Sequence, residues 1–346
     1  MKALVKTTKG VGNIEVVERE KPTIESPEVL IQIDTAAVCG TDLHIYHDRF
    51  PYWPPVILGH EFAGTIVEVG SSVKDWQVGD RVVGEPHTMA CGKCRLCRTG
   101  NPQICNEKRS PGWGIDGAFA RFMRFPEPKL LHRIPEGMDA STACLAEPLA
   151  NIVSDLVLNH AVQAGDVVLV SGPGPIGVMA ALTSKYMGAA KVIVVGTNQD
   201  EATRLHFCRN QKSIDTVINV QNENELDIIN ELTNGMGVDV VVEASGAAPA
   251  IAMGVQALRK MGTFTAIGLT GTNDISFPYD SFMKKAIKFH FNISTKYESW
   301  EPTLVMLANG MIPVEEYITH RGGLENWKSM FEALESGKAM KAIFEF

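Results

Sequence analysis

The sequence predicts an α/β protein with two domains, a doubly wound parallel sheet and a discontinuous, mostly β domain. The first observation is length, because 346 residues exceed the size at which one hydrophobic core usually keeps growing. The second is that short β-like runs broken by Gly, Pro and Asp, such as VLIQID and TIVEVG, fill residues 1–152. The third is that strands alternate with helices over residues 153–290, which is typical of a parallel sheet.

The domain boundaries follow from the same residue patterns. The strands within residues 153–290, such as VVLVSG and KVIVVG, are continuously apolar, which indicates that helices cover both faces of their sheet. Residues 291–346 return to mixed character and are too few to form a core alone. We therefore expect them to pack back on residues 1–152, with a cysteine-rich lobe at about 88–108.

The composition excludes several classes of protein. The chain is 45% hydrophobic and 21% charged, as in an ordinary globular protein, and its net charge of -8 gives no general attraction for nucleic acid or anionic lipid. The N-terminal residues lack the apolar region of a signal peptide, and we expect no membrane-spanning segment. Seven cysteines, four of them crowded together, suit metal binding in a reducing compartment, so we expect a cytoplasmic protein.

A glycine-rich turn follows the first strand of the second domain. In VVLVSGPGPIGVMAAL, Gly172 permits a tight turn, Gly174 lets the backbone approach a pyrophosphate, and Gly177 lets the following helix pack closely on the strand. A tight strand-to-helix turn without a ligand is the alternative. The predicted dinucleotide-binding loop comprises Gly172, Gly174, Pro175, Ile176 and Gly177.

The end of the next strand bears on the choice between NAD and NADP. An acid there would bind the adenosine ribose of NAD, but the strand ends in Gly196, Thr197 and Asn198. These residues leave room for a 2′-phosphate, and Arg204 follows one turn or so later. The alternatives are that Arg204 is only a solvated helix charge and that Asp200 supplies the missing acid.

Four cysteines form the pattern Cx2Cx2Cx7C. Cys91, Cys94, Cys97 and Cys105 lie in a loop rich in Gly, Lys and Arg, and four thiolates at this spacing predict a closed tetrahedral zinc site with a structural role. An iron–sulfur cluster also takes four thiolates, but the fourth cysteine lacks the following proline. Unliganded structural cysteines are the remaining alternative.

A second metal site is indicated by four residues that are ordinary when taken singly. Cys39 in AAVCGTDLH, His60 and Glu61 in ILGHEFAG, and Glu147 in CLAEPLAN offer sulfur, nitrogen and oxygen donors. A catalytic zinc needs about three such ligands and one open position. A hydrogen-bonded histidine and a small buried cysteine are the alternatives.

Together, CGTDLH, GHEFAGTIVEVG, the four-cysteine lobe and GPGPIG resemble the zinc-containing medium-chain alcohol and polyol dehydrogenases. The motifs keep the family's order over nearly the whole chain, and EPLAN with Glu147 is similar to the sorbitol and threonine dehydrogenase branch. The resemblance implies a Rossmann coenzyme domain, a GroES-like catalytic domain, two zinc ions per chain, and NAD or NADP.

The resemblance also implies roles for the residues of the second metal site. Cys39, His60 and Glu61 correspond to catalytic zinc ligands or near-ligands. Glu147 either coordinates the metal or holds its water, and Asp42 orients His60.

The family's proton route corresponds to Thr41, beside the alcohol oxygen, and His44, which passes the proton toward solvent.

A strand end within TFTAIGL is expected to line the nicotinamide pocket. Its residues are Ile267, Gly268 and Leu269.

The segment TKYESW is similar to a substrate-binding segment of sorbitol dehydrogenases, with Lys296 in place of an arginine and Tyr297 retained. A lysine cannot make the planar bidentate contact of a guanidinium, so a phosphorylated or differently sized polyol is favoured over sorbitol itself.

These observations predict hydride transfer between a secondary alcohol and NAD(P), with a small polyol-type substrate and a homo-oligomer, dimer or tetramer. An L-threonine 3-dehydrogenase activity is the alternative within the enzyme class. The acidic net charge disfavours a zinc-lobed nucleic-acid binder. The joint presence of a ligand set and a proton route disfavours a catalytically silent relative.

Overall fold

The computed structural model describes residues 1–272, 274–276, 278–291 and 293–346. The chain divides into two compact units, and each is described by itself. Unit 1 comprises Met1–Asn151, Ser294–Glu335 and Lys341–Phe346, whereas unit 2 comprises Ile152–Ile293 and Ser336–Met340.

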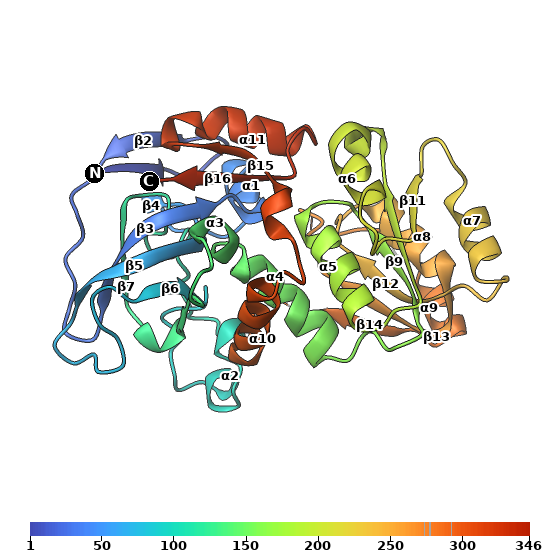
Figure 1. Ribbon diagram of the computed structural model, residues 1–346, viewed down its shortest axis with the longest axis horizontal. Coiled ribbons are helices and arrows are strands. Elements are labelled where there is room, and N and C mark those ends of the chain that lie inside the picture. Colours follow the sequence, from blue (N-terminus) through green and yellow to red (C-terminus); the bar gives the residue numbers. More distant parts are fainter. Residues whose placement is uncertain (273, 277, 292) are drawn as a thin grey trace. The chain divides into compact units, whose positions relative to one another are not determined.

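Unit 2 contains a six-stranded sheet in the order β11-β10-β9-β12-β13-β14, and neighbouring strands are parallel throughout (Figure 1). Since β9 lies in the middle, the connections run outward in both directions, and ligands of doubly wound folds bind at this switch point. The predicted doubly wound sheet is therefore confirmed. Its strands are β9 (Val167–Ser171), β10 (Lys191–Gly196), β11 (Thr216–Asn219), β12 (Val238–Glu243), β13 (Leu258–Ala266) and β14 (Lys288–Phe291).

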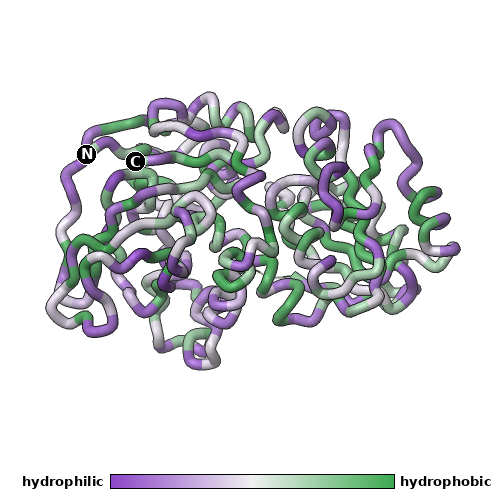
Figure 2. Tube along the Cα trace, in the orientation of Figure 1, coloured by the Kyte–Doolittle hydropathy of each residue, from purple (hydrophilic) through white to green (hydrophobic). Residues whose placement is uncertain are grey.

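Both faces of this sheet are covered, as its continuously apolar strands predict. Leu169 and Val241 share one buried cluster with Ile251 and Val255 of helix α8 (Ala248–Ala257). The intervening strand residues, such as Val170, are also completely buried. Figure 2 shows the strands of this sheet as mostly hydrophobic.

Two helices of unit 2 begin at residues that favour a helix start. Pro175 is the first residue of α5, where its missing N–H is harmless, and Asn224 caps α7 by accepting a hydrogen bond from the Asp227 amide at 3.3 Å. The remaining helices are α5 (Pro175–Tyr186), α6 (His206–Arg209), α7 (Glu225–Leu232) and α9 (Tyr279–Lys285).

Unit 1 is mostly β. One sheet has the order β15-β16-β3-β5-β6-β8, with β7 also paired to β3, and a smaller sheet has the order β2-β1-β4. The predicted second domain class is thus confirmed. The strands are β1 (Lys2–Lys6), β2 (Ile14–Glu18), β3 (Val29–Ala37), β4 (Val56–Ile57), β5 (Glu61–Val69), β6 (Arg81–Gly84), β7 (Phe122–Phe125), β8 (Leu131–Arg133), β15 (Ile318–Gly322) and β16 (Lys341–Glu345).

The late strands β15 and β16 complete the sheet of unit 1 through antiparallel pairing of β16 with β3. The C-terminal residues therefore share a core with the N-terminal segment, and the lone lysine of the apolar strand KAIFE enters that core. The helices of unit 1 are α1 (Gly40–Tyr46), α2 (Arg95–Arg98), α3 (Ala140–Ala143), α4 (Ala146–Ile152), α10 (Tyr297–Ala308) and α11 (Trp327–Glu335).

One helical run of 19 residues, Ala140–Leu158, is long and apolar enough to cross a bilayer by length and composition. Most of it, 72%, is buried inside the protein, which is the behaviour of a core helix. The expectation that no segment reaches membrane-spanning length is therefore wrong for this run.

Candidate active site

Three ligand-type side chains converge at the junction of α1 and β5. Cys39 directly precedes α1, while His60 and Glu61 lie at the start of β5. Their sulfur, ring-nitrogen and carboxylate-oxygen atoms lie within 4.8 Å of one another, and His60 and Glu61 are buried. Residues separated by about twenty positions are thus brought into one donor set.

Asp42 fixes the backbone on both sides of this set. Its carboxylate accepts a hydrogen bond from the Cys39 amide at 2.9 Å and another from the Gly59 amide at 3.3 Å. Asp42 is completely buried, so these contacts replace its lost hydration. It acts on Cys39 and on the residue preceding His60 through their backbones.

The charges around His60 favour a cation. Burial alone lowers the pKa of His60, but the negative charges of Cys39, Asp42 and Glu147 outweigh burial and raise it to about 10. The Nδ1 atom of His60 is buried without a hydrogen-bond partner. An electronegative pocket with an unused nitrogen fits a bound metal ion.

Glu147 faces the same pocket from α4 but lies outside the tight three-residue group. Its Oε1 accepts a hydrogen bond from Asn151 Nδ2 at 3.0 Å, one helical turn later. Burial raises the pKa of Glu147, with Glu61 acting in the same direction and His60 against it. In the described residues, Glu61 is therefore closer to the position of a ligand than Glu147.

A residue that the sequence analysis missed pairs with Glu61. Nζ of Lys341, in β16, lies 2.5 Å from Glu61 Oε2, and both side chains are buried. Burial lowers the pKa of Lys341, but Glu61 and Cys39 raise it more. A lysine within the apolar strand KAIFE was the available signal, because such a residue needs a buried partner.

The two residues of the predicted proton route lie on helix α1. Oγ1 of Thr41 lies 3.8 Å from Cys39 Sγ. His44 follows three positions later and so shares its face of the helix. Burial lowers the pKa of His44, with smaller contributions from Arg49 and His47. This histidine is therefore neutral at neutral pH and able to accept a proton.

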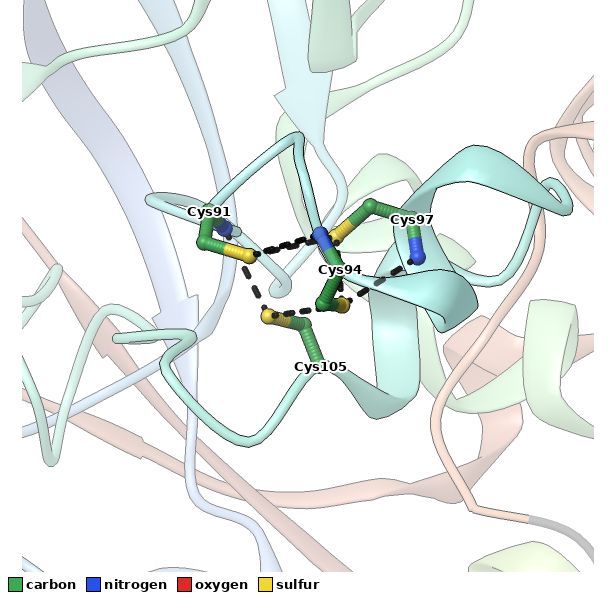
Figure 3. Close-up of side chains that lie close together, drawn as sticks. All are labelled: Cys91, Cys94, Cys97 and Cys105. Carbon is green, nitrogen blue, oxygen red and sulfur yellow. Dashed lines mark hydrogen bonds between the residues drawn. The ribbon is translucent and has the colours of Figure 1, made fainter.

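The four cysteines of the lobe point toward one another (Figure 3). Their sulfur atoms are separated by 4.0 Å (Cys91 to Cys97), 3.6 Å (Cys94 to Cys97) and 4.0 Å (Cys94 to Cys105). Four sulfurs placed tetrahedrally at about 2.3 Å from a zinc ion are roughly 3.8 Å apart.

Backbone amides also support the charged form of these sulfurs. The Cys94 amide donates to Cys91 Sγ at 3.4 Å, and the Cys97 amide donates to Cys94 Sγ at 3.5 Å. Such contacts stabilise thiolates, which are the ligand form of cysteine. The donor set therefore fits a closed structural zinc site.

The glycine loop of unit 2 has the geometry of a phosphate cradle. Gly172 has a positive φ of 97°, and a Cβ there would lie 2.9 Å from the Ser245 side chain. A Cβ on Gly177 would lie 1.9 Å from the Gly172 carbonyl oxygen, whereas Gly174 faces open space at the start of α5. A helix N-terminus beside that space suits a pyrophosphate.

The loop from Glu243 also supports this crevice. The buried Glu243 carboxylate, at the end of β12, accepts hydrogen bonds from the backbone of Ser245 at 2.9 Å and of Gly246 at 3.1 Å. The three predicted nicotinamide residues directly follow the end of β13, and the amides of the first two donate to the Glu243 carbonyl. These residues are Ile267, Gly268 and Leu269.

The end of β10 is organised by side chains that bond to one another. Asp200 accepts hydrogen bonds from the Thr197 amide at 3.1 Å and pairs with Arg204 at 3.1 Å. Arg204 also donates to the Ala339 carbonyl at 3.2 Å. Asn198 Oδ1 accepts from the Asn219 side chain at 2.8 Å. Arg204 is thus already engaged by an acid, which weakens it as a phosphate ligand.

Lys296 and Tyr297 lie at the start of α10. Lys296 is the residue before the first turn, and Tyr297 is exposed with its ring 5.4 Å from the ring of His132. Trp113, which the sequence analysis also missed, places its ring edge-on to His60 at 5.1 Å. The aromatic ring beside His60 forms one wall of the donor set.

Comparisons with known proteins agree with this arrangement. The family model of the alcohol dehydrogenase GroES-like domain matches residues 25–136, and that of the zinc-binding dehydrogenase matches residues 175–309. A sorbitol dehydrogenase of Halalkalibacterium halodurans is 37% identical over 99% of this chain and 98% of its own length. A D-arabitol-phosphate dehydrogenase of Enterococcus avium is 30% identical over 100% and 97%. An L-threonine 3-dehydrogenase of Rhizobium rhizogenes is 33% identical over 100% and 99%.

Solved structures give the same result. An alcohol dehydrogenase from Thermus sp. ATN1 superposes with a TM-score of 0.89 at 29% identity, covering 100% of this chain and 99% of that one. A zinc-binding dehydrogenase from Sinorhizobium meliloti 1021 bound to NADP superposes with a TM-score of 0.90 at 25% identity, with the same coverage.

Proposed function

The chain belongs to the zinc-binding alcohol dehydrogenase family, and from this membership we propose that it oxidises a secondary hydroxyl of a polyol or polyol phosphate. It is a zinc- and NAD(P)-dependent oxidoreductase of the medium-chain type. The observation that supports the proposed chemistry is the convergence of Cys39, His60 and Glu61 within 4.8 Å, beside a proton-accepting helix.

The residues of unit 1 divide the work of the reaction. When bound at this donor set, zinc supplies Lewis acidity that lowers the pKa of the substrate hydroxyl. In this proposal Thr41 accepts the hydroxyl proton and donates its own proton onward, and the neutral His44 receives it. The 3.8 Å separation of Thr41 Oγ1 from Cys39 Sγ and the lowered pKa of His44 support these roles. NAD(P) held at the glycine loop supplies the hydride acceptor.

The substrate class rests on the relatives and on the turn at Lys296. Two of the relatives are named for a polyol and a polyol phosphate. An ammonium group at Lys296 can donate to a hydroxyl and more strongly to a phosphate, since it is a compact charge with three donors. L-Threonine is the second candidate, because a threonine dehydrogenase is 33% identical over the whole chain.

We further propose a cytoplasmic homo-oligomer, dimer or tetramer. Seven thiols without a disulfide among the described residues suit a reducing compartment. Strand β14 is last in the order of its sheet, and β14 and the segments on either side of it in sequence carry exposed apolar side chains, which favours pairing with a second copy. These side chains are Tyr279, Met283, Phe291 and Ile293. Light scattering after gel filtration would measure the number of subunits.

The test of the proposed function is one panel assay on the zinc-loaded protein. Polyols, polyol phosphates, simple secondary alcohols and L-threonine are each offered with NAD and with NADP, and reduced cofactor is measured. We expect the highest kcat/KM for a polyol or polyol phosphate. Preference for L-threonine would establish the second candidate, and equal, low activity on every compound would contradict both.

A further inference from the structure

A buried histidine of β8 joins the end of β6 to helix α10. Nδ1 of His132 lies 2.9 Å from Glu301 Oε1, and its Nε2 lies 3.2 Å from Glu85 Oε1. Glu85 is completely buried, whereas the Glu301 carboxylate reaches the surface. Ionised carboxylates only accept hydrogen bonds, so a ring that faces one at each nitrogen donates from both and is an imidazolium.

The ring of His132 also lies against the first turn of α10. It is stacked on the indole of Trp300, with centroids 5.0 Å apart and planes inclined by 5°, and it lies 5.4 Å from the ring of Tyr297. Trp300 is buried and donates from Nε1 to Thr295 Oγ1 at 3.0 Å. A cation over an indole face is attracted by the ring. His132 thus contacts α10 through a carboxylate, an indole and a phenol.

The two carboxylates favour the protonated form of this ring, while burial raises the pKa of Glu85 and His132 lowers it. Burial lowers the pKa of His132, but Glu85 and Glu301 together raise it above its usual value. His87 lies 3.5 Å from the other oxygen of Glu85, and burial with nearby positive charges lowers the pKa of His87 to about 4, so it is neutral. Among the described residues, Glu298 also acts on Glu85, and Lys108 and Lys129 act on His87.

We propose that the imidazolium of His132 is a positioning residue, which holds the first turn of α10 so that Lys296 and Tyr297 meet the substrate. This inference rests on the proposed function and on the resemblance of TKYESW to a substrate-binding segment, by which these two side chains bind the alcohol. Both are attached to a turn whose inner side contacts His132, directly at Tyr297 and through Trp300. A displacement of about 1 Å in such a turn is enough to reduce substrate binding severely.

The first test is a kinetic comparison on the zinc-loaded enzyme with the best alcohol of the panel. We expect His132→Asn to raise KM for the alcohol about tenfold, which corresponds to about 1.4 kcal/mol of lost binding, while KM for the cofactor stays the same. Glu301→Gln, at the exposed end of the contact, should change KM in the same direction but less. The matched control is His206→Asn, an exposed histidine of α6, which should behave as wild type.

A pH profile separates positioning from a general structural effect. As pH rises through the raised pKa of His132, the ring loses a proton and its attraction to both carboxylates, so KM for the alcohol should rise in wild type. This rise should be absent in His132→Asn. Nitrogen NMR of the histidine rings provides a readout without turnover, and both ring nitrogens of His132 should carry protons at pH 7.

The outcomes separate the two proposals. If Lys296→Met and Tyr297→Phe raise KM while His132→Asn and Glu301→Gln do not, the positioning role is wrong and the substrate site stands. If Lys296→Met and Tyr297→Phe leave KM unchanged, the substrate site is wrong and the positioning role falls with it. A singly protonated His132 ring at pH 7 would overturn the inference regardless of the kinetics.

Discussion

Nζ of Lys341 lies 2.5 Å from Oε2 of Glu61, and both side chains are almost completely buried beside Cys39 and His60. Removing one member of a buried ion pair leaves the other charge without compensation. We therefore expect Lys341→Met to lower the free energy of unfolding of the zinc-free protein by about 3–5 kcal/mol, measured by denaturant titration, since a bound zinc ion would itself compensate Glu61.

The double variant Lys341→Met/Glu61→Leu is the matched control. It removes both charges, so it should recover much of the stability that the single variant loses. The double variant should have no activity, because the carboxylate of the donor set is gone. A single Lys341→Met protein as stable as wild type would show that the pair contributes no net stabilisation.

The fold class could be predicted because it depends on local patterns. Continuous apolar strands such as VVLVS and a glycine turn opening α5 specify a parallel sheet with covered faces. The pairing of β16 with β3 was expected only in outline, since the size argument returns the tail to the first domain without giving a register. The pattern of apolar and polar residues in a strand does not show which distant strand it pairs with.

The candidate site divides in the same way. The lobe cysteines and the glycine loop were predictable because the residues of each lie close together in the sequence and therefore close together in the site. Lys341 and His132 could not be assigned partners, because Glu61 and Glu85 approach them from distant segments. The environment of Arg204 likewise depends on Ala339, far along the chain.

The lobe offers a test of structural against catalytic metal. Cys94→Ser removes one sulfur from the closed set, and we expect the zinc content to fall by about one ion per chain together with a lower Tm. Metal analysis and calorimetry on the same sample check this. Cys208→Ala, a buried cysteine of α6 in unit 2, should leave the zinc content unchanged. Unaltered zinc in Cys94→Ser would contradict the lobe assignment.

Glu147 should affect turnover more than cofactor binding. Its carboxylate faces the His60 pocket, whereas the glycine loop belongs to unit 2. We expect Glu147→Ala to reduce kcat at least about a hundredfold, the usual range for a positioned acid–base or metal-adjacent group. Dinucleotide affinity, measured by calorimetry, should change less than about twofold.

Asn151→Ala is a milder change at the same contact. It removes the hydrogen bond to Glu147 at 3.0 Å and leaves the carboxylate in place. An intermediate loss of kcat is expected, since an unfixed carboxylate samples unproductive positions. Wild-type turnover in Glu147→Ala would show that this carboxylate has no part in the reaction.

The pH dependence of oxidation should report His44. Burial lowers the pKa of His44, so its neutral, proton-accepting form persists to more acidic pH than that of an ordinary histidine. As pH falls through that lowered value, kcat/KM for the alcohol should fall. His44→Gln should abolish this acidic limb and reduce activity at its plateau. If kcat/KM of His44→Gln still falls at the same acidic pH as in wild type, the group that titrates is not His44.

The last prediction concerns the cofactor. The strand β10 ends without an acid at Gly196 and Thr197, and we propose that NADP is accepted alongside NAD. Gly196→Asp is an unsuitable probe, because a Cβ there would lie 2.8 Å from the ring of Pro173 and 2.9 Å from Leu205. Asn198→Asp keeps the size of the side chain and adds one negative charge beside the same strand end. It should lower kcat/KM for NADP by about tenfold relative to NAD, since a carboxylate repels a 2′-phosphate but accepts from a ribose hydroxyl.

Arg204 completes this test. Because Asp200 and the Ala339 carbonyl already hold its guanidinium, we expect Arg204→Met to change the NADP preference less than Asn198→Asp does. Melting curves with and without each cofactor control for damage to the contact with Ala339. If wild type uses NAD alone and Asn198→Asp leaves the ratio of the two kcat/KM values unchanged, the open end of β10 does not admit a 2′-phosphate. Asp200 would then be the next residue to test as the ribose ligand, because it accepts a hydrogen bond from the Thr197 amide at the same strand end.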